Sequence, residues 1–154
     1  MRPSRGERPG PSCNPKEGAK APALTVASMN GSKTSIAPGK VTLIDFWATW
    51  CKPCEKSFPA YQSLYTKYKD KGFEVIAVAV DDPDTKAKIP GFVKTSGAKF
   101  PVGWDEDHAL ADCWKVKNMP SAYIIDRQGV VRHIHVEWKD DSEKKVEAQI
   151  KALL

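Results

Sequence analysis

The feature that most constrains this chain is an apolar strand that runs into a C-x-x-C motif. Residues 41–47 are apolar except for a threonine and an aspartate, as in a central strand covered on both faces. After three intervening residues comes Cys51-Lys52-Pro53-Cys54, and the stretch after it has helical spacing of apolar residues. We therefore expect a strand, a short turn and a helix whose first turn carries the two cysteines.

Two cysteines at the start of a helix favour redox chemistry. The unpaired backbone N–H groups and the helix dipole stabilise an anion there, so the Cys51 thiol can ionise near neutral pH. Cys54 lies about one turn further on and can close a disulfide with Cys51. Pro53 suits a first turn, where a missing N–H costs nothing, and Lys52 adds a positive charge. We predict that Cys51 is the nucleophile and Cys54 the resolving thiol.

The same motif also occurs in haem and zinc sites. Haem attachment requires a histidine directly after the second cysteine, but Glu55 stands there. A structural zinc site needs two more ligands, and the other cysteines, Cys13 and Cys113, are isolated in the sequence. We expect Cys13 to be an unpaired tail cysteine, because the residues before it lack the small-apolar pattern of a lipid-attachment site. Cys113 is expected to be a small buried thiol, and neither a metal site nor a cofactor is predicted.

The residues around the motif resemble the thioredoxin superfamily, since Asp45-Phe-Trp-Ala-Thr-Trp-Cys-Lys-Pro-Cys54 is similar to its active-site signature. Other segments resemble its TlpA/ResA-like branch of bacterial cell-envelope thiol–disulfide oxidoreductases. These are Gly18-Ala-Lys-Ala-Pro-Ala-Leu24, Gly39-Lys-Val41, Phe58-Pro59 with Leu64, and Met119-Pro120-Ser-Ala-Tyr-Ile-Ile-Asp126 with Gly129. The resemblance implies an α/β thioredoxin fold: a mixed central sheet flanked by helices, with an N-terminal hairpin and a TlpA-like insertion at residues 83–104.

Asp45 requires an explanation, because a carboxylate in an apolar strand is costly to bury. Its position matches the buried acid beneath the dithiol in thioredoxins, which implies that it helps to remove the proton of Cys54. The alternative is a strand-end aspartate that reaches solvent or caps a turn. TlpA-like proteins often carry a different acid shortly after the second cysteine, but Ser57 stands at that place here and Glu55 two residues before it.

Pro120 matches the cis-proline that faces the dithiol in this family. A cis bond there implies that the backbone of Met119 pairs with a substrate strand in the mixed disulfide. The residues expected to contact the substrate are Trp50, Lys52, Pro53 and Met119. His133 and His135 alternate along a strand, which favours a solvent-facing surface over a metal pair.

Residues 1–17 are predicted to be a disordered basic leader and residues 18–154 one thioredoxin-like domain. Five basic and two acidic side chains within residues 1–20 supply most of the formal net charge of +5. The small net charge of the rest of the chain is typical of a solvated surface and does not indicate a nucleic-acid-binding surface. We see no apolar run long enough to cross a membrane and no signal-peptide pattern, so we expect a signal or anchor to be absent from this chain.

The apolar periodicity predicts the secondary structure beyond the motif. It predicts helices at residues 53–71, 85–95, 106–114 and 140–154, strands at 41–47, 74–80, 100–104, 121–125 and 130–136, and a hairpin around Asn30-Gly31. Residues 81–84 are predicted to be the turn and cap of the second helix. Strands that alternate with helices and then end in a hairpin and a helix indicate a mixed sheet.

The combined prediction is a thiol–disulfide oxidoreductase that exchanges a Cys51–Cys54 dithiol with protein thiols and disulfides. The resemblance implies a periplasmic or cell-envelope reductant rather than a cytoplasmic one, with apocytochrome c among its partners and an upstream membrane electron donor. We expect a monomer that binds no nucleic acid. The alternative is a copper(I) metallochaperone that uses Cys51, Cys54 and a histidine, because soft thiolates suit this ion.

Overall fold

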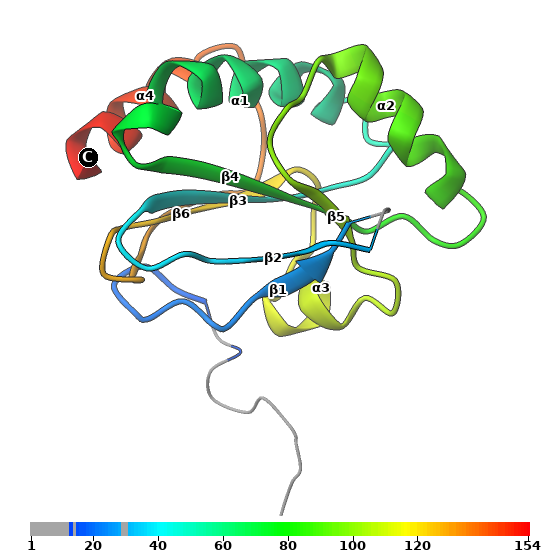
Figure 1. The fold of residues 1–154 in the computed structure, drawn as a ribbon, viewed down its shortest axis with the longest axis horizontal. Helices are drawn as coiled ribbons and strands as arrows, with labels where there is room; N and C mark the ends of the chain where they lie inside the picture. Colours follow the sequence, from blue (N-terminus) through cyan, green and yellow to red (C-terminus); the bar gives the residue numbers. More distant parts are fainter. Residues whose placement is uncertain (1–12, 14, 29–30) are drawn as a thin grey trace, which may run out of the picture.

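The structure, a computed structural model, describes Cys13, residues 15–28 and residues 31–154. A five-stranded sheet with the order β5-β4-β3-β6-β7 forms its centre, and β1 and β2 form a separate two-stranded sheet (Figure 1). The strands are β1 (Thr25–Ala27), β2 (Lys33–Ser35), β3 (Val41–Trp47), β4 (Phe73–Ala79), β5 (Val102–Trp104), β6 (Ser121–Ile125) and β7 (Val131–His135). The helices are α1 (Cys54–Tyr68), α2 (Ile89–Ser96), α3 (Ala109–Cys113) and α4 (Ser142–Leu153), with 3-10 turns at Lys69–Lys71 and Lys86–Lys88. The predicted mixed α/β fold and its N-terminal hairpin are confirmed.

Both faces of the central sheet are covered. Figure 1 shows α1, α2 and α4 along one face, and α3 with the β1–β2 pair on the other. On the first face Trp47 packs against Phe58 of α1, with ring centroids 4.4 Å apart. On the second face Phe46 packs against Tyr123 and against Trp114, which follows α3. All seven residues of β3 are buried as a result, which explains why its sequence is a continuous apolar run.

The two neighbours of β3 run in opposite directions. β4 is parallel to β3 and β6 is antiparallel to it, with Asp45 in register with Ala77 on one side and Ala122 on the other. The carboxyl end of β3 and the amino end of β6 therefore meet at the same edge of the sheet. The segment that leaves β3 and the segment that enters β6 are brought together there, although they are far apart in the sequence.

Two of the predicted helices begin later than expected. The helix predicted at residues 85–95 starts as a 3-10 turn and becomes α2 only at Ile89, with Pro90 in its first turn. The helix predicted at residues 106–114 is only five residues long, because His108 adopts a left-handed conformation with φ 61° and cannot continue a helix. Asp105 accepts hydrogen bonds from the backbone N–H groups of Leu110 and Ala111 and so fixes the start of α3.

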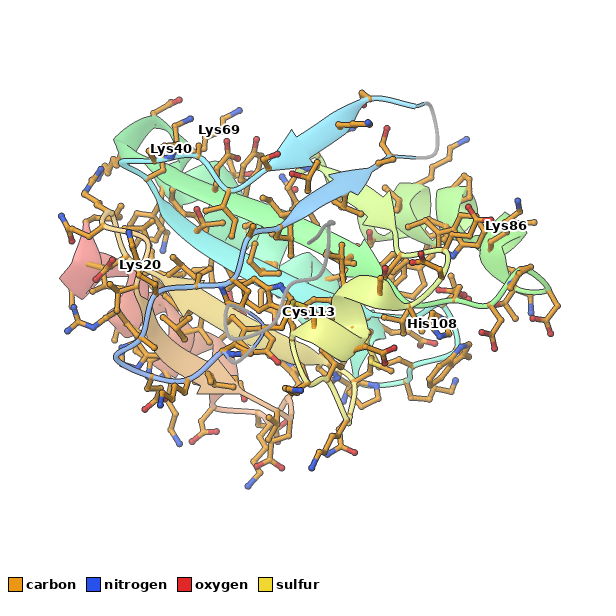
Figure 2. All side chains as sticks on the ribbon, turned by 90° about the horizontal axis from the view of Figure 1, so that it is seen from below. Lys20, Lys40, Lys69, Lys86, His108 and Cys113 are labelled. Atoms are coloured by element: carbon orange, nitrogen blue, oxygen red, sulfur yellow. A yellow bond between two sulfur atoms is a disulfide. The ribbon has the colours of Figure 1, made fainter. Side chains whose placement is uncertain are left out.

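The expectation that Cys13 is unpaired is wrong. Cys13 forms a disulfide with Cys113, with a Cα–Cα distance of 4.6 Å across a sequence separation of 100 residues. Cys113 ends α3, on the sheet face that is seen in Figure 2, and is half-buried rather than a buried free thiol. No local pattern can reveal this bond, because only the folded sheet brings the two cysteines into contact.

The segment after Cys13 lies along β7. Gly18 donates its backbone N–H to the carbonyl of Val131 at 2.7 Å, and the Glu17 carboxylate accepts from the N–H of Ile134 at 3.2 Å. Residues 1–12 and 14 of the predicted leader lie outside the described residues, so the division at residue 17 stays a prediction. In the described part of the chain, no helix combines the length and the apolar character that a bilayer crossing requires.

Candidate active site

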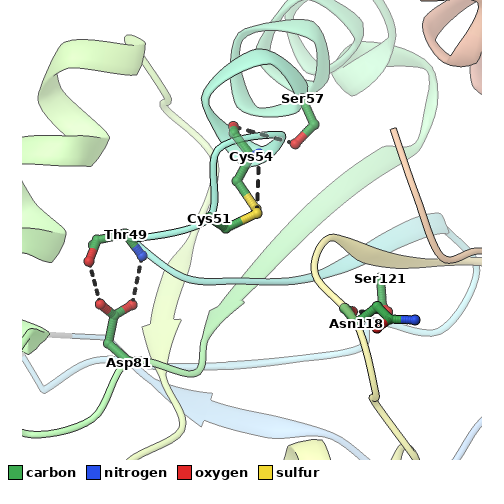
Figure 3. Close-up of a disulfide and its surroundings, with 7 residues drawn as sticks. All are labelled: Thr49, Cys51, Cys54, Ser57, Asp81, Asn118 and Ser121. Carbon is green, nitrogen blue, oxygen red and sulfur yellow. Dashed lines mark hydrogen bonds between the residues drawn. A yellow bond between two sulfur atoms is a disulfide. The ribbon is translucent and has the colours of Figure 1, made fainter. Parts of the chain in front are cut away.

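The dithiol lies where β3 ends and α1 begins. The backbone N–H of Cys51 donates to the carbonyl of Ala48 at 3.1 Å, which closes a turn between the strand and the helix. Cys51 and Cys54 form a disulfide with a Cα–Cα distance of 5.3 Å. Cys54 is the first residue of α1, and its N–H donates to the Cys51 sulfur at 3.2 Å (Figure 3). The Cys51 sulfur therefore lies at the helix N-terminus, where a thiolate is stabilised.

The two sulfurs differ in access. Cys51 keeps 4% of its surface exposed, whereas Cys54 has none. Next to Cys51, Trp50 is 58% exposed, which is unusual for so large an apolar side chain. Lys52 is also exposed, and its Nζ lies 3.8 Å from a carboxylate oxygen of Glu55. Of the two cysteines, only Cys51 keeps exposed surface, and its sequence neighbours Trp50 and Lys52 are both exposed.

The predicted cis-proline is present on the facing loop. The bond between Met119 and Pro120 is cis, and Pro120 directly precedes β6. Because Ser121 pairs with Phe46 near the end of β3, the cis bond lies at the edge of the sheet where the dithiol lies. Ser121 donates its hydroxyl to the carbonyl of Asn118, which closes the turn before the strand (Figure 3).

Asp45 is completely buried, which excludes the alternative that it reaches solvent. Neither of its carboxylate oxygens has a hydrogen-bond partner among the described residues, and burial raises the pKa of Asp45 well above its usual range. Asp45 shares a face of β3 with Trp47, the face that α1 covers. The pKa of Tyr61 in α1 is raised by burial and also by the charge of Asp45. Cys54 lies two turns before Tyr61 and therefore on the same side of α1.

No carboxylate is buried at the position shortly after Cys54 where TlpA-like proteins often carry an acid. Ser57 is buried, and its hydroxyl donates to the carbonyl of Cys54 at 3.4 Å. Glu55 is exposed and pairs with Lys52 at the surface. Asp45 is therefore the buried carboxylate that faces the helix of the dithiol.

The predicted histidine face is partly exposed. His135 is half-buried, and its Nε2 lies 2.7 Å from the amide oxygen of Gln149 in α4. His133 is also half-buried, and burial lowers its pKa. The predicted solvent-facing side of this strand is therefore partly covered, at His135 by α4. Within the described residues, no group of three or more His, Cys, Asp or Glu side chains is arranged to hold a metal ion.

Sequence reasoning missed one part of the site, the carboxylate of Asp81. Asp81 is fully buried and accepts hydrogen bonds from both the backbone N–H and the hydroxyl of Thr49, two residues before Cys51 (Figure 3). We predicted only a turn and helix cap for residues 81–84. A carboxylate directly after a buried strand was the available signal, but its partner lies 32 residues away in the sequence.

A groove between α1 and α2 opens beside the dithiol. Its volume is about 680 Å³, and it is lined by Thr49, Glu55, Pro59, Lys88, Gly91, Phe92, Thr95 and Ser96. Thr49 and Glu55 stand on either side of the C-x-x-C motif in the sequence. The groove therefore adjoins the segment that carries the dithiol.

Comparison with known proteins finds a matching family and relatives that are named as thiol-disulfide oxidoreductase or thioredoxin-like proteins. The AhpC/TSA family matches residues 18–134. Thiol-disulfide oxidoreductase ResA from Bacillus thuringiensis (strain Al Hakam) is 40% identical over 116 residues, which cover 74% of this chain and 66% of that protein. The match thus spans slightly less than two thirds of the ResA relative. Thioredoxin-like protein YneN from Bacillus subtilis (strain 168) is 36% identical over 137 residues, which cover 86% of this chain and 79% of YneN.

A solved structure shows the same architecture. The crystal structure of a candidate thiol:disulfide interchange protein DsbE from Chlorobium tepidum superposes with a TM-score of 0.83 at 34% identity. The likeness covers 90% of this chain and 98% of that one. These relatives confirm the predicted thioredoxin fold and the resemblance to ResA-like proteins, and they give no support to the copper(I) alternative. With the family match extending over most of its length, the chain belongs to the AhpC/TSA family.

Proposed function

We propose that this protein is a thiol–disulfide oxidoreductase that exchanges the Cys51–Cys54 disulfide with thiols and disulfides of other proteins. The observation that carries the proposal is the position of the Cys51 sulfur, 3.2 Å from the first backbone N–H of α1, with Cys54 as its disulfide partner. An N–H donor and the helix dipole at this sulfur favour the thiolate, which is the attacking species in disulfide exchange. The ResA name of a relative agrees with this activity.

The reaction proceeds in two exchanges. The Cys51 thiolate attacks one sulfur of a substrate disulfide, the substrate S–S bond breaks, and the other substrate sulfur leaves as a thiolate that takes up a proton. Cys54 then loses its proton and attacks the Cys51 sulfur, which closes the Cys51–Cys54 bond and releases the second substrate thiol. Two electrons pass from the protein to the substrate. The same steps in reverse oxidise a substrate dithiol, so the reduction potential decides the direction.

Asp45 is the group we propose as the acceptor of the Cys54 proton. Cys54 is fully buried, so bulk water has little access to its thiol. Burial raises the pKa of Asp45 well above its usual range, which brings this carboxylate closer to the pKa of a thiol. Only ionised Asp45 can accept a proton. The resolution step should therefore accelerate as the pH rises through the pKa of Asp45.

The substrate is proposed to bind as an extended strand beside the cis-proline. Met119 would pair its backbone with this strand, while Trp50, Lys52 and Pro53 would contact the residues that flank the substrate cysteine. The exposure of Trp50 and the position of Pro120 directly before β6 support this arrangement. Both features lie at the edge of the sheet that carries Cys51.

The physiological role is proposed to be that of a monomeric reductant in the periplasm or cell envelope. Apocytochrome c is the proposed substrate, and a membrane protein is the proposed electron donor. The Cys13–Cys113 bond supports this location, because disulfides outside an active site form and persist mainly in oxidising compartments.

The test is reduction of insulin by the reduced protein, followed by equilibration of the Cys51–Cys54 pair against glutathione or thioredoxin. We expect insulin reduction and a potential within the range of about −270 to −120 mV that is spanned by C-x-x-C proteins. A parallel anaerobic copper(I) titration of the reduced protein distinguishes the oxidoreductase from the alternative, a copper(I) metallochaperone. A protein that binds copper(I) tightly but neither reduces nor oxidises protein thiols would contradict the proposal.

A further inference from the structure

The turn that precedes Cys51 is anchored from outside the active site. The N–H of Cys51 bonds to the carbonyl of Ala48, so residues 48–51 form one tight turn. Within this turn the Trp50 side chain faces solvent and Cys51 faces the helix, with 58% and 4% of their surfaces exposed. The orientation of the Cys51 sulfur therefore depends on what holds the turn.

Asp81 holds the turn at Thr49. Its Oδ1 accepts the backbone N–H of Thr49 at 3.0 Å, and its Oδ2 accepts the hydroxyls of Thr49 at 2.5 Å and of Thr85 at 2.8 Å. Asp81 is the second residue after β4, and the N–H of Val80, between them, donates to the carbonyl of Trp47 at 2.8 Å. The carboxylate thus extends the pairing of β3 and β4 into the turn that carries Cys51.

Asp81 is itself held firmly. Trp104 in β5 donates its indole N–H to the backbone carbonyl of Asp81 at 2.7 Å, and Lys86 lies over the Trp104 ring at 4.7 Å. Thr85 and Lys86 belong to the insertion that links β4 to β5, at the end of the sheet where Figure 2 shows Lys86 and His108. A fully buried side chain fixed on both its carboxylate and its backbone is a rigid support for the turn.

We propose that Asp81 is a positioning residue for Cys51: through Thr49 it fixes the turn that holds the Cys51 sulfur at the N-terminus of α1. The inference rests on the proposed function, in which Cys51 is the nucleophile. Hydrogen bonding, not charge, is the useful property of Asp81, because a nearby negative charge by itself opposes thiolate formation.

The test compares Thr49→Val with two matched variants. Thr49→Val removes the hydroxyl that binds Asp81, Thr49→Ser keeps it, and Thr66→Val makes the same change at an exposed position of α1. The measurement is the rate of iodoacetamide alkylation of Cys51 in the reduced protein as a function of pH, assigned by peptide mass mapping. The variants alter none of the ionisable side chains near the turn, among them Asp45, Lys52, Cys54, Glu55 and Asp81. A shift of the alkylation midpoint therefore reports geometry.

We expect the midpoint of Thr49→Val to rise by about 1 pH unit, because a loosened turn moves the sulfur away from the helix terminus. Thr49→Ser and Thr66→Val should keep the wild-type midpoint. A purely structural contact would lower the melting temperature of Thr49→Val without moving the midpoint. That result would overturn the proposal.

The alkylation experiment needs no protein substrate, so its outcome is separate from that of the proposed function. A shifted midpoint in Thr49→Val would support the positioning role even if insulin were not reduced. An unshifted midpoint in a protein that reduces insulin would remove Asp81 from the site and leave the oxidoreductase proposal intact.

Discussion

The two disulfides of this protein join cysteines in very different settings. Cys51–Cys54 has a sequence separation of three and lies at the N-terminus of the 15-residue helix α1. Cys13–Cys113 has a sequence separation of 100 and joins the N-terminal segment to the last residue of α3. A helix N-terminus stabilises a thiolate, whereas a helix C-terminus disfavours an anion. The same covalent bond is thus placed where it can exchange in one case and where it can persist in the other.

The difference in loop length has an energetic consequence. In the chain-entropy account, a disulfide stabilises the fold by restricting the unfolded chain, and a loop of about 100 residues corresponds to about 4.7 kcal/mol. The Cys51–Cys54 bond closes a loop of only a few residues and therefore restricts the unfolded chain far less. We therefore assign chemistry to Cys51–Cys54 and stability to Cys13–Cys113, and each prediction below is a way to test that division.

The largest expected effect is on activity. Cys51→Ser should reduce insulin reduction to the uncatalysed background, because it removes the attacking thiolate. Cys54→Ser should instead accumulate mixed disulfides through Cys51, which appear as higher-mass species on non-reducing gels and in mass spectra. If Cys51→Ser trapped as many mixed disulfides as Cys54→Ser, the assignment of nucleophile and resolving thiol would be wrong.

The next effect is on stability. The double variant Cys13→Ser with Cys113→Ser should lower the free energy of unfolding by about 2–5 kcal/mol, measured by urea denaturation, while insulin reduction by the folded protein stays unchanged. The matched control is wild-type protein in which Cys51–Cys54 alone has been reduced. A double variant that keeps its stability but loses activity would show that Cys13–Cys113 serves activity rather than stability.

A third prediction concerns Asp45, the proposed proton acceptor of the exchanging pair. Asp45→Asn should slow resolution of the mixed disulfide above neutral pH by about tenfold or more, because an amide cannot accept the Cys54 proton. It should also stabilise the fold at pH 7, since a buried carboxylate without hydrogen bonds is costly to ionise. Stopped-flow kinetics and thermal melts measure the two effects. Unchanged turnover between pH 6 and pH 9 would contradict the proton-acceptor role.

The pH dependence of this stabilisation has a definite sign. The pKa of Asp45 is raised in the folded protein, so between its unfolded and folded values the folded state binds the extra proton and stability falls as the pH rises. Below the unfolded pKa, Asp45 is protonated in both states and the penalty is absent. The stability gain of Asp45→Asn should therefore shrink as the pH falls towards the usual range of a carboxyl group.

The smallest expected effect is at the surface beside the dithiol. Lys52 and Glu55 form an exposed pair at 3.8 Å, and such pairs contribute about 0–1 kcal/mol. Glu55→Gln should leave the melting temperature nearly unchanged and should not slow resolution of the mixed disulfide. A resolution defect as large as that of Asp45→Asn would move the proton-acceptor role to Glu55.

The sequence predicted the parts of this molecule that depend on local pattern. The strand of Asp45, the dithiol helix and the proline before β6 are each encoded by neighbouring residues, and the family resemblance supplied their roles. The pairing of Cys13 with Cys113 and the contact of Asp81 with Thr49 were missed, because each joins residues distant in sequence and neither partner has a distinctive neighbourhood. The short length of α3 was missed because His108 adopts a left-handed conformation that no residue type there demands.

The spacing of the cysteines also bears on how the chain acquires its bonds during synthesis. Cys13 emerges first, and Cys51 and Cys54 both appear before Cys113, its native partner. Closing the short Cys51–Cys54 loop costs less entropy than joining either cysteine to Cys13, so early closure withdraws two competing thiols. In a Cys54→Ser chain, Cys51 has no partner and can compete with Cys113 for Cys13 throughout synthesis. Oxidative refolding of Cys54→Ser should therefore yield less Cys13–Cys113 and more Cys13–Cys51 than refolding of the wild-type chain, so the reactive pair also protects the correct pairing of the structural one.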